Sequence, residues 1–151
     1  MKKGFSLICV AVLAMTALIC LAEESPLTTT ELEEVPVMKM YINDTPVEVA
    51  WEDNEAVAAL RELAAEGLTI QMAMYGGFEQ VGDIGQRLPS QDVQTVTEAG
   101  DLVLYSSDQL VVFYGSNSWA YTRLGRITDQ TPEELRALLA HGDVTITLTV
   151  E

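Results

Sequence analysis

The sequence predicts a mainly β domain, built as a closed or nearly closed antiparallel barrel with two short helices. Three observations support this fold class. Of the 151 residues, 48% are hydrophobic and 21% are charged, which is enough apolar material for a packed core. Short apolar or alternating segments recur between turn residues at intervals of about ten residues, as in barrels and sandwiches. Two further segments have the periodicity of helices, which could cover the open ends of the barrel.

The N-terminus predicts a secretory signal peptide over residues 1–22. Two lysines precede an uncharged apolar run over residues 5–21, and Ala22 is followed by an acidic stretch. This layout places cleavage after Ala22, so we expect the mature protein to be secreted or extracytoplasmic. Two alternatives remain open. An uncleaved leader could anchor the protein in a membrane, or Cys20 could be the modified residue of a lipoprotein.

The charge of the chain argues against several kinds of partner. Eight basic and 23 acidic residues give a net charge of -15, and loss of the two leader lysines gives 6 - 23 = -17. Such an acidic protein is not expected to bind nucleic acid or anionic lipid. Both cysteines lie in the leader, so the mature protein would have no disulfide. Residues 23–36 hold five acids, two prolines and no base, which predicts an extended linker.

A domain over residues 37–151 follows this linker. Seven of its segments have strand character: residues 37–42, 47–51, 68–74, 101–106, 109–115, 119–127 and 143–150. Ser107 and Asp108 separate two of them and indicate a hairpin. Residues 75–100 are predicted to be mostly loop, because five glycines and Pro89 interrupt them.

Two helices are predicted from their caps and their periodicity. Asp53 or Asn54 can cap the first helix, whose apolar residues recur at spacings of three and four and which ends at Gly67. Thr131 can cap the second helix, in which a proline occupies the first turn and which extends to His141. Both helices are short, so most of the core must come from the strands.

Three motifs lie along this domain: MYGGFExVG at residues 74–82, GDLVLY at residues 100–105 and FYGSNSWxYTRLG at residues 113–125. Together they resemble the bacterial cyclophilin-like fold proteins, a family distinct from the true cyclophilin isomerases, over about residues 38–151. The resemblance implies a closed eight-stranded cyclophilin-type barrel with a helix at each end, and it brings no established activity. The Phe-His-Arg segment of true cyclophilins is absent, so no isomerase residue can be transferred to this chain.

Two separated segments hold most of the candidate ligand-binding residues. In the first, two glycines allow close backbone approach between aromatic rings. In the second, amide and hydroxyl groups lie beside an indole and precede an arginine on the same strand. The candidates, with one arginine from the long loop, are Tyr75, Gly76, Gly77, Phe78, Glu79, Arg87, Asn117, Ser118, Trp119, Tyr121 and Arg123. They form one pocket if both segments lie at the same end of the barrel. Otherwise they are tight turns with their rings packed inside, and the arginines form surface ion pairs.

No catalytic, metal or cofactor motif is present in the sequence, and no nucleophile has a histidine nearby. The sequence therefore favours a non-catalytic module that binds a small molecule or an extended peptide. The alternative is a divergent peptidyl-prolyl cis-trans isomerase, in which Arg123 would donate to the twisted amide. A third possibility is an accessory domain whose acidic surface only keeps it soluble.

Overall fold

The computed structural model describes residues 35–151, so the predicted signal peptide and nearly all of the predicted linker lie outside the described residues. The elements are β1 (Met38–Ile42), β2 (Thr45–Val47), β3 (Val49–Trp51), α1 (Glu55–Ala65), β4 (Leu68–Gln71), β5 (Ala73–Tyr75), β6 (Glu79–Asp83), β7 (Val93–Val96), β8 (Asp101–Tyr105), β9 (Gln109–Phe113), β10 (Ser118–Ile127), α2 (Pro132–Leu139) and β11 (Thr145–Val150). In this part of the chain, neither helix has the length and apolar character needed to cross a membrane.

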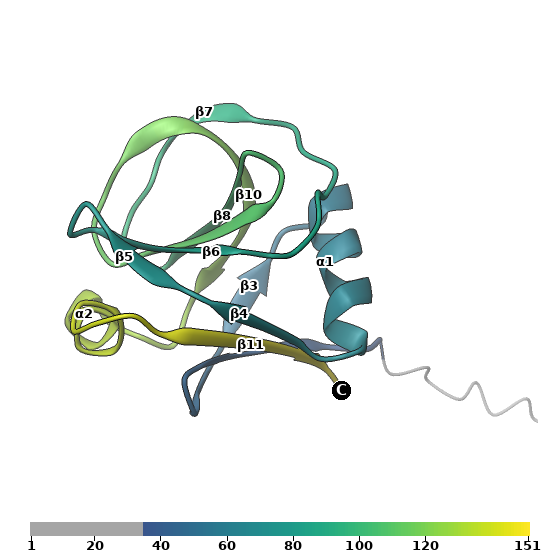
Figure 1. The fold of residues 1–151 in the computed structure, drawn as a ribbon, viewed down its shortest axis with the longest axis horizontal. Coiled ribbons are helices and arrows are strands. Elements are labelled where there is room, and N and C mark those ends of the chain that lie inside the picture. The colour runs from purple at the N-terminus through teal and green to yellow at the C-terminus, as the bar shows by residue number, and fades with distance from the viewer. Residues whose placement is uncertain (1–34) are drawn as a thin grey trace, which may run out of the picture. The chain divides into compact units, whose positions relative to one another are not determined.

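The strands form two antiparallel sheets (Figure 1). The order is β2-β1-β11-β4 in the four-stranded sheet and β3-β10-β8-β9-β6-β5 in the seven-stranded sheet, where β7 also pairs with β10. Neither sheet closes on itself. The prediction of a mainly β domain with two helices is confirmed, but the closed eight-stranded barrel is wrong.

The barrel fails to close because two segments that were predicted as continuous strands change sheets. Residues 47–51 break at Glu48, so β2 pairs with β1 and β3 pairs with β10. Residues 68–74 break at Met72, so β4 pairs with β11 and β5 pairs with β6. The sheets approach each other at Gly82 of β6, where a Cβ atom would lie 2.5 Å from Met72 Sδ. This close packing joins the sheets without a hydrogen-bonded ladder.

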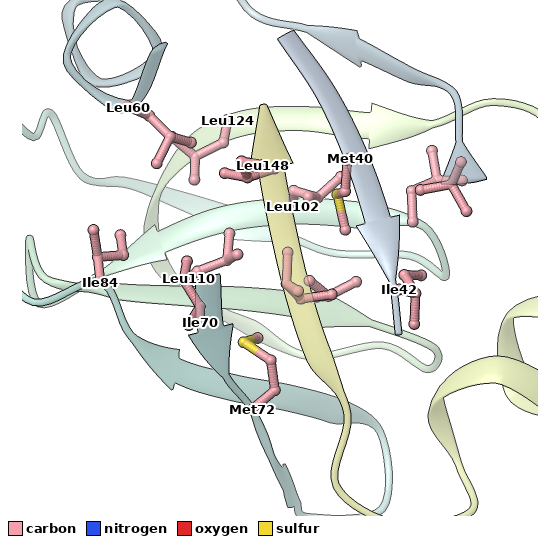
Figure 2. Packing of buried hydrophobic residues seen from close by; sticks show 14 of the residues in the cluster. Met40, Ile42, Leu60, Ile70, Met72, Ile84, Leu102, Leu110, Leu124 and Leu148 are labelled. Atoms are coloured by element: carbon pink, nitrogen blue, oxygen red, sulfur yellow. The ribbon is translucent and has the colours of Figure 1, made fainter. Parts of the chain in front are cut away.

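The main core lies between the two sheets (Figure 2). Met40 of β1 and Leu148 of β11 point into it from the four-stranded sheet, and Leu102 of β8 and Leu110 of β9 point into it from the other. Leu60 of α1 completes the packing at one side. Each of these side chains is essentially inaccessible to solvent, and such burial contributes about 1.5–3 kcal/mol per large aliphatic residue.

Both helices form where their caps predict them, on opposite sides of the domain in Figure 1. Asn54 Oδ1 accepts a hydrogen bond from the Val57 amide at 2.9 Å, so Asn54 caps α1. Thr131 caps α2 in a complete capping box. The second helix ends at Leu139, two residues before the predicted end at His141.

Most of residues 75–100 lie outside strands, as predicted, but the segment also contains two short strands that were not predicted, β6 and β7. β6 has few apolar residues, but it pairs with β9 along its whole length. Its buried Gln80 donates from Nε2 to the carbonyl oxygens of Leu139 and Gly142, both at 2.7 Å. These bonds satisfy free carbonyls at the end of α2. Partners far along the chain therefore stabilise β6, and its own pattern does not reveal it.

Candidate functional site

A hollow of about 440 Å³ opens on the face of the seven-stranded sheet opposite the main core. Strand alternation produces this second face, because Leu102 and Leu104 point into the core while Val103 between them points the other way. The residues that line the hollow are Tyr75, Glu79, Val81, Tyr105, Gln109, Val111, Asn117, Trp119 and Tyr121. We call it the Glu79 hollow.

Two hairpins build the floor and part of the wall of the Glu79 hollow. In the β5–β6 hairpin, Tyr75 lies directly opposite Glu79. In the β8–β9 hairpin, Tyr105 lies directly opposite Gln109. Val81 of β6 is opposite Val111 of β9, which joins the hairpins side by side. Directly opposed residues share one face of a sheet, so this register brings all these side chains together.

Aromatic rings form much of the lining. Tyr121 is only 4% exposed, and its ring makes edge contacts with Phe113 at 5.7 Å and Tyr105 at 6.1 Å between ring centroids. Trp119, two residues earlier on β10, is 57% exposed, and Tyr75 is also largely exposed. The structure thus combines a packed aromatic floor with aromatic side chains that are open to solvent. Exposed aromatic groups beside a hollow are typical of surfaces that bind partners or ligands.

Glu79 is the unusual polar group of the hollow. Its side chain belongs to a residue only 6% exposed, and its Oε2 atom is buried without a hydrogen-bond partner. This burial raises the pKa of the Glu79 carboxyl from 4.5 to about 7. Burial, and after it the charge of Glu79, also raises the pKa of the Tyr114 and Tyr121 phenols above 10. Among residues 35–151, no lysine, arginine or histidine lines the hollow.

Asn117 is held rigidly at the rim. Its Nδ2 donates to Tyr121 Oη at 2.9 Å, and its Oδ1 accepts from the Ser118 amide at 2.9 Å. Thr97 Oγ1 donates a hydrogen bond to the backbone carbonyl of Asn117 and accepts one from its backbone N–H. These contacts fix the loop before Trp119. They also occupy both the Nδ2 and the Oδ1 atom of the Asn117 side chain, which leaves little of the side-chain amide free to recognise a ligand.

The structure brings five of the eleven sequence candidates to the Glu79 hollow: Tyr75, Glu79, Asn117, Trp119 and Tyr121. Gly76 and Gly77 instead form the turn of the β5–β6 hairpin, both with positive φ. A Cβ atom on Gly76 would collide with the ring of Phe78, which is half-buried and packs against the small cluster beneath the hollow. Ser118 is exposed at the rim and does not line the hollow.

The two candidate arginines lie elsewhere. Arg87 pairs with Asp108 at 3.6 Å. Arg123 pairs at 3.3 Å with Asp101, which is fully buried and also accepts from Arg126 Nε at 2.9 Å. Arg123 lines a separate hollow of about 540 Å³ beside the start of α1, and Tyr121 lies between the two hollows.

Sequence reasoning missed Val81, Tyr105, Gln109 and Val111. The last three belong to the hairpin that was correctly predicted around Ser107. Val111 and Gln109 are two residues apart on one strand and so share a face, and Tyr105 lies directly opposite Gln109, so the hairpin pattern could have placed all three on the same face. Val81 had no such signal, because its segment was predicted as loop. Within residues 35–151, no cluster of three or more histidine, cysteine or acidic side chains could hold a metal ion.

The fold and the site define a two-sheet β domain with an aromatic hollow on its outer face. Residues 40–151 match the model of the Cyclophilin-like family, and the chain belongs to that family. The resemblance carried by the three sequence motifs is therefore confirmed. No curated protein and no solved structure gives a significant match to the chain.

Proposed function

We propose that the domain is a non-catalytic binding module, whose small-molecule or extended-peptide ligand occupies the Glu79 hollow. The observation that carries this proposal is the combination of exposed Trp119 and Tyr75 with a buried, unpaired carboxylate in one hollow. A ligand would cover the aromatic surface and supply the missing partner of Glu79. Ligand sites typically combine apolar walls with a few placed polar groups.

The alternative function, a divergent peptidyl-prolyl isomerase, has less support. Such an enzyme needs a hydrogen-bond donor beside an apolar proline pocket, because the barrier to rotation is about 20 kcal/mol. Arg123 would be that donor, but its guanidinium pairs with Asp101 and lines the other hollow. A protease-coupled isomerisation assay tests this alternative directly. If a small amount of the protein speeds up the slow cis-trans isomerisation of the peptide substrate, the result would favour an isomerase over a simple binding module.

We further propose that the protein acts outside the cytoplasm, on the basis of the predicted leader over residues 1–22. Mass spectrometry of the protein from its native host separates the three forms of the N-terminus. Cleavage after Ala22 gives a free mature chain, a retained leader gives the full mass, and lipidation adds acyl mass at Cys20. An open hollow that receives ligand from the medium is consistent with each of these forms.

The binding proposal is tested by titrating the protein with libraries of metabolites and short peptides. The readout is the pair of tryptophan indole signals in a two-dimensional NMR spectrum, assigned with a Trp119→Phe variant. We expect a ligand to shift the signal of Trp119, while Trp51, whose Nε1 donates to the Met38 carbonyl at 2.9 Å, stays unchanged as an internal control. Loss of the exposed Trp119 ring in Trp119→Ala should weaken binding about tenfold without unfolding the domain, measured by titration calorimetry because this variant lacks the Trp119 signal. Silence of the Trp119 signal across both libraries would refute the proposal.

A further inference from the structure

We propose that the ligand of the Glu79 hollow carries a positive charge, as an ammonium group held between the Glu79 carboxylate and the surrounding aromatic rings. This inference rests on the proposed function and names its ligand class: an organic amine with a small apolar body. It follows from the charge, the burial and the ring content of the hollow.

In the described part of the chain, the lining of the Glu79 hollow carries one acidic group and no basic group. Glu79 is the single carboxylate among the lining residues, and no basic side chain accompanies it. The basic residues nearest in sequence are engaged elsewhere: Arg87 pairs with Asp108, and Arg123 pairs with Asp101. The hollow thus offers one uncompensated negative charge to whatever enters it.

The unpaired Glu79 carboxylate has an energetic cost that a cation would remove. Burying a carboxylate without a partner is costly, and Oε2 of Glu79 makes no hydrogen bond to the described residues. An entering ammonium group removes this cost in a setting where the two charges are poorly screened by water. An ammonium group that keeps an N–H can also donate a charge-assisted hydrogen bond, whereas a quaternary ammonium acts through its charge alone. A neutral ligand would leave the ionised carboxylate unpaired.

Aromatic side chains form a wall of the Glu79 hollow. Tyr75, Tyr105, Trp119 and Tyr121 surround the same hollow as Glu79. Cations bind favourably over aromatic faces, most strongly over tryptophan, and aromatic cages are used to recognise quaternary ammonium groups. Rings and a carboxylate together suit an alkylated amine, whose methyl groups contact the rings while its charge stays near Glu79.

A competing account is that Glu79 is protonated and donates a hydrogen bond to a neutral acceptor such as a carbonyl. The two accounts predict opposite effects of pH. The phenols whose pKa the charge of Glu79 affects are those of Tyr114 and Tyr121, and burial together with this charge raises both pKa values above the ordinary phenol range. Glu79 is therefore the group of the hollow that changes charge near pH 7. Cation binding should strengthen as pH rises through this value, and binding of a neutral acceptor should weaken.

The experiment compares choline with 3,3-dimethylbutan-1-ol, which has nearly the same shape but no charge. Choline keeps its charge at every pH, so any pH dependence comes from the protein. With the Trp119 indole signal as the readout, we expect choline to bind at least about tenfold more tightly than the alcohol at about pH 8. At about pH 6 its affinity should fall about tenfold, because only about one tenth of the Glu79 carboxyls are then ionised.

Two matched variants separate the local charge from the general acidity of the protein. Glu79→Gln keeps the size of the side chain and should abolish the pH dependence of choline binding and reduce the preference for choline to the part that the aromatic rings supply. Asp83→Asn removes one charge from an exposed position at the end of the same strand, and it should leave choline binding within about twofold of the original value. The unshifted Trp51 signal shows that each variant is folded.

The outcomes distinguish this inference from the proposed function. If the alcohol binds as tightly as choline, or if Glu79→Gln binds choline normally, the cationic ligand is refuted while the hollow remains a binding site. If choline fails but neutral library members shift the Trp119 signal, the same conclusion holds. Silence of every compound overturns both proposals. A parallel titration with a lysine whose α-amino and carboxyl groups are blocked separates a peptide side chain from a free amine as the source of the ammonium group.

Discussion

Replacing Glu79 with glutamine should make the folded protein more stable at neutral and alkaline pH. Burial raises the pKa of this carboxyl from 4.5 to about 7, so the folded state holds a proton that the unfolded chain has already released. The stability that Glu79 supports is therefore complete below about pH 4.5 and is lost as pH rises to about 7. A difference of about 2.5 units at about 1.36 kcal/mol per unit corresponds to about 3 kcal/mol.

The assay is urea denaturation of the original protein and of Glu79→Gln at a series of pH values between about 4 and about 8. The difference in unfolding free energy should be flat in acid, grow in favour of the variant as pH rises, and level off near 3 kcal/mol above about pH 7. Glu62→Gln, at an exposed position of α1, is the matched control and should show no such growth. A difference that is independent of pH, or that favours the original protein at high pH, would refute the assignment of a buried, unpaired carboxylate.

Three further substitutions test how the scaffold holds the site. Asp101→Asn replaces the buried carboxylate that binds Arg123 and Arg126 with a neutral amide, and it should lower the unfolding free energy by about 2 kcal/mol in urea denaturation. An unchanged midpoint would show that these ion pairs do not stabilise the fold. Gln80→Glu removes the donor to two carbonyl groups at the end of α2, so amide hydrogen exchange in α2 should become faster, whereas unaltered protection would argue against this link. Gly82→Ala places a methyl group within 2.5 Å of Met72 Sδ and should lower the unfolding free energy by about 1–3 kcal/mol in urea denaturation. An unchanged unfolding free energy would show that the two sheets are not tightly packed at this point.

Local signals in the sequence predicted the helices well. An N-cap depends on a side chain and an amide a few residues away, so Asn54 and Thr131 carry the information within their own segments. The same holds for the hairpin around Ser107 and Asp108. These elements form where they were expected because their determining contacts are close in sequence.

The closed barrel was mispredicted because sheet membership is decided by distant partners. Nothing in the alternation of residues 47–51 or 68–74 marks the point at which each strand changes sheets. β6 was missed for a related reason: Gln80 and Gly82 look unsuitable for a buried strand until α2 and β4 are packed against them. Such contacts join residues far apart in the chain, and composition alone does not reveal them.

The candidate site was predicted in outline but not in its chemistry. The motifs pointed correctly to the two segments that meet at the hollow, including Glu79 and Trp119. Arg123 was expected beside Trp119, but Asp101, whose segment was predicted as an apolar strand, pairs with it instead. The burial of Glu79 depends on the shape of the whole face, so its raised pKa became evident only with the fold.

A crystal structure of the protein soaked with choline at about pH 8 would show whether the Glu79 hollow holds a cationic ligand. We expect electron density for the trimethylammonium group in contact with both the Glu79 carboxylate and the Trp119 ring. Density for choline only at other surfaces, with the hollow holding none at saturating concentration, would contradict it.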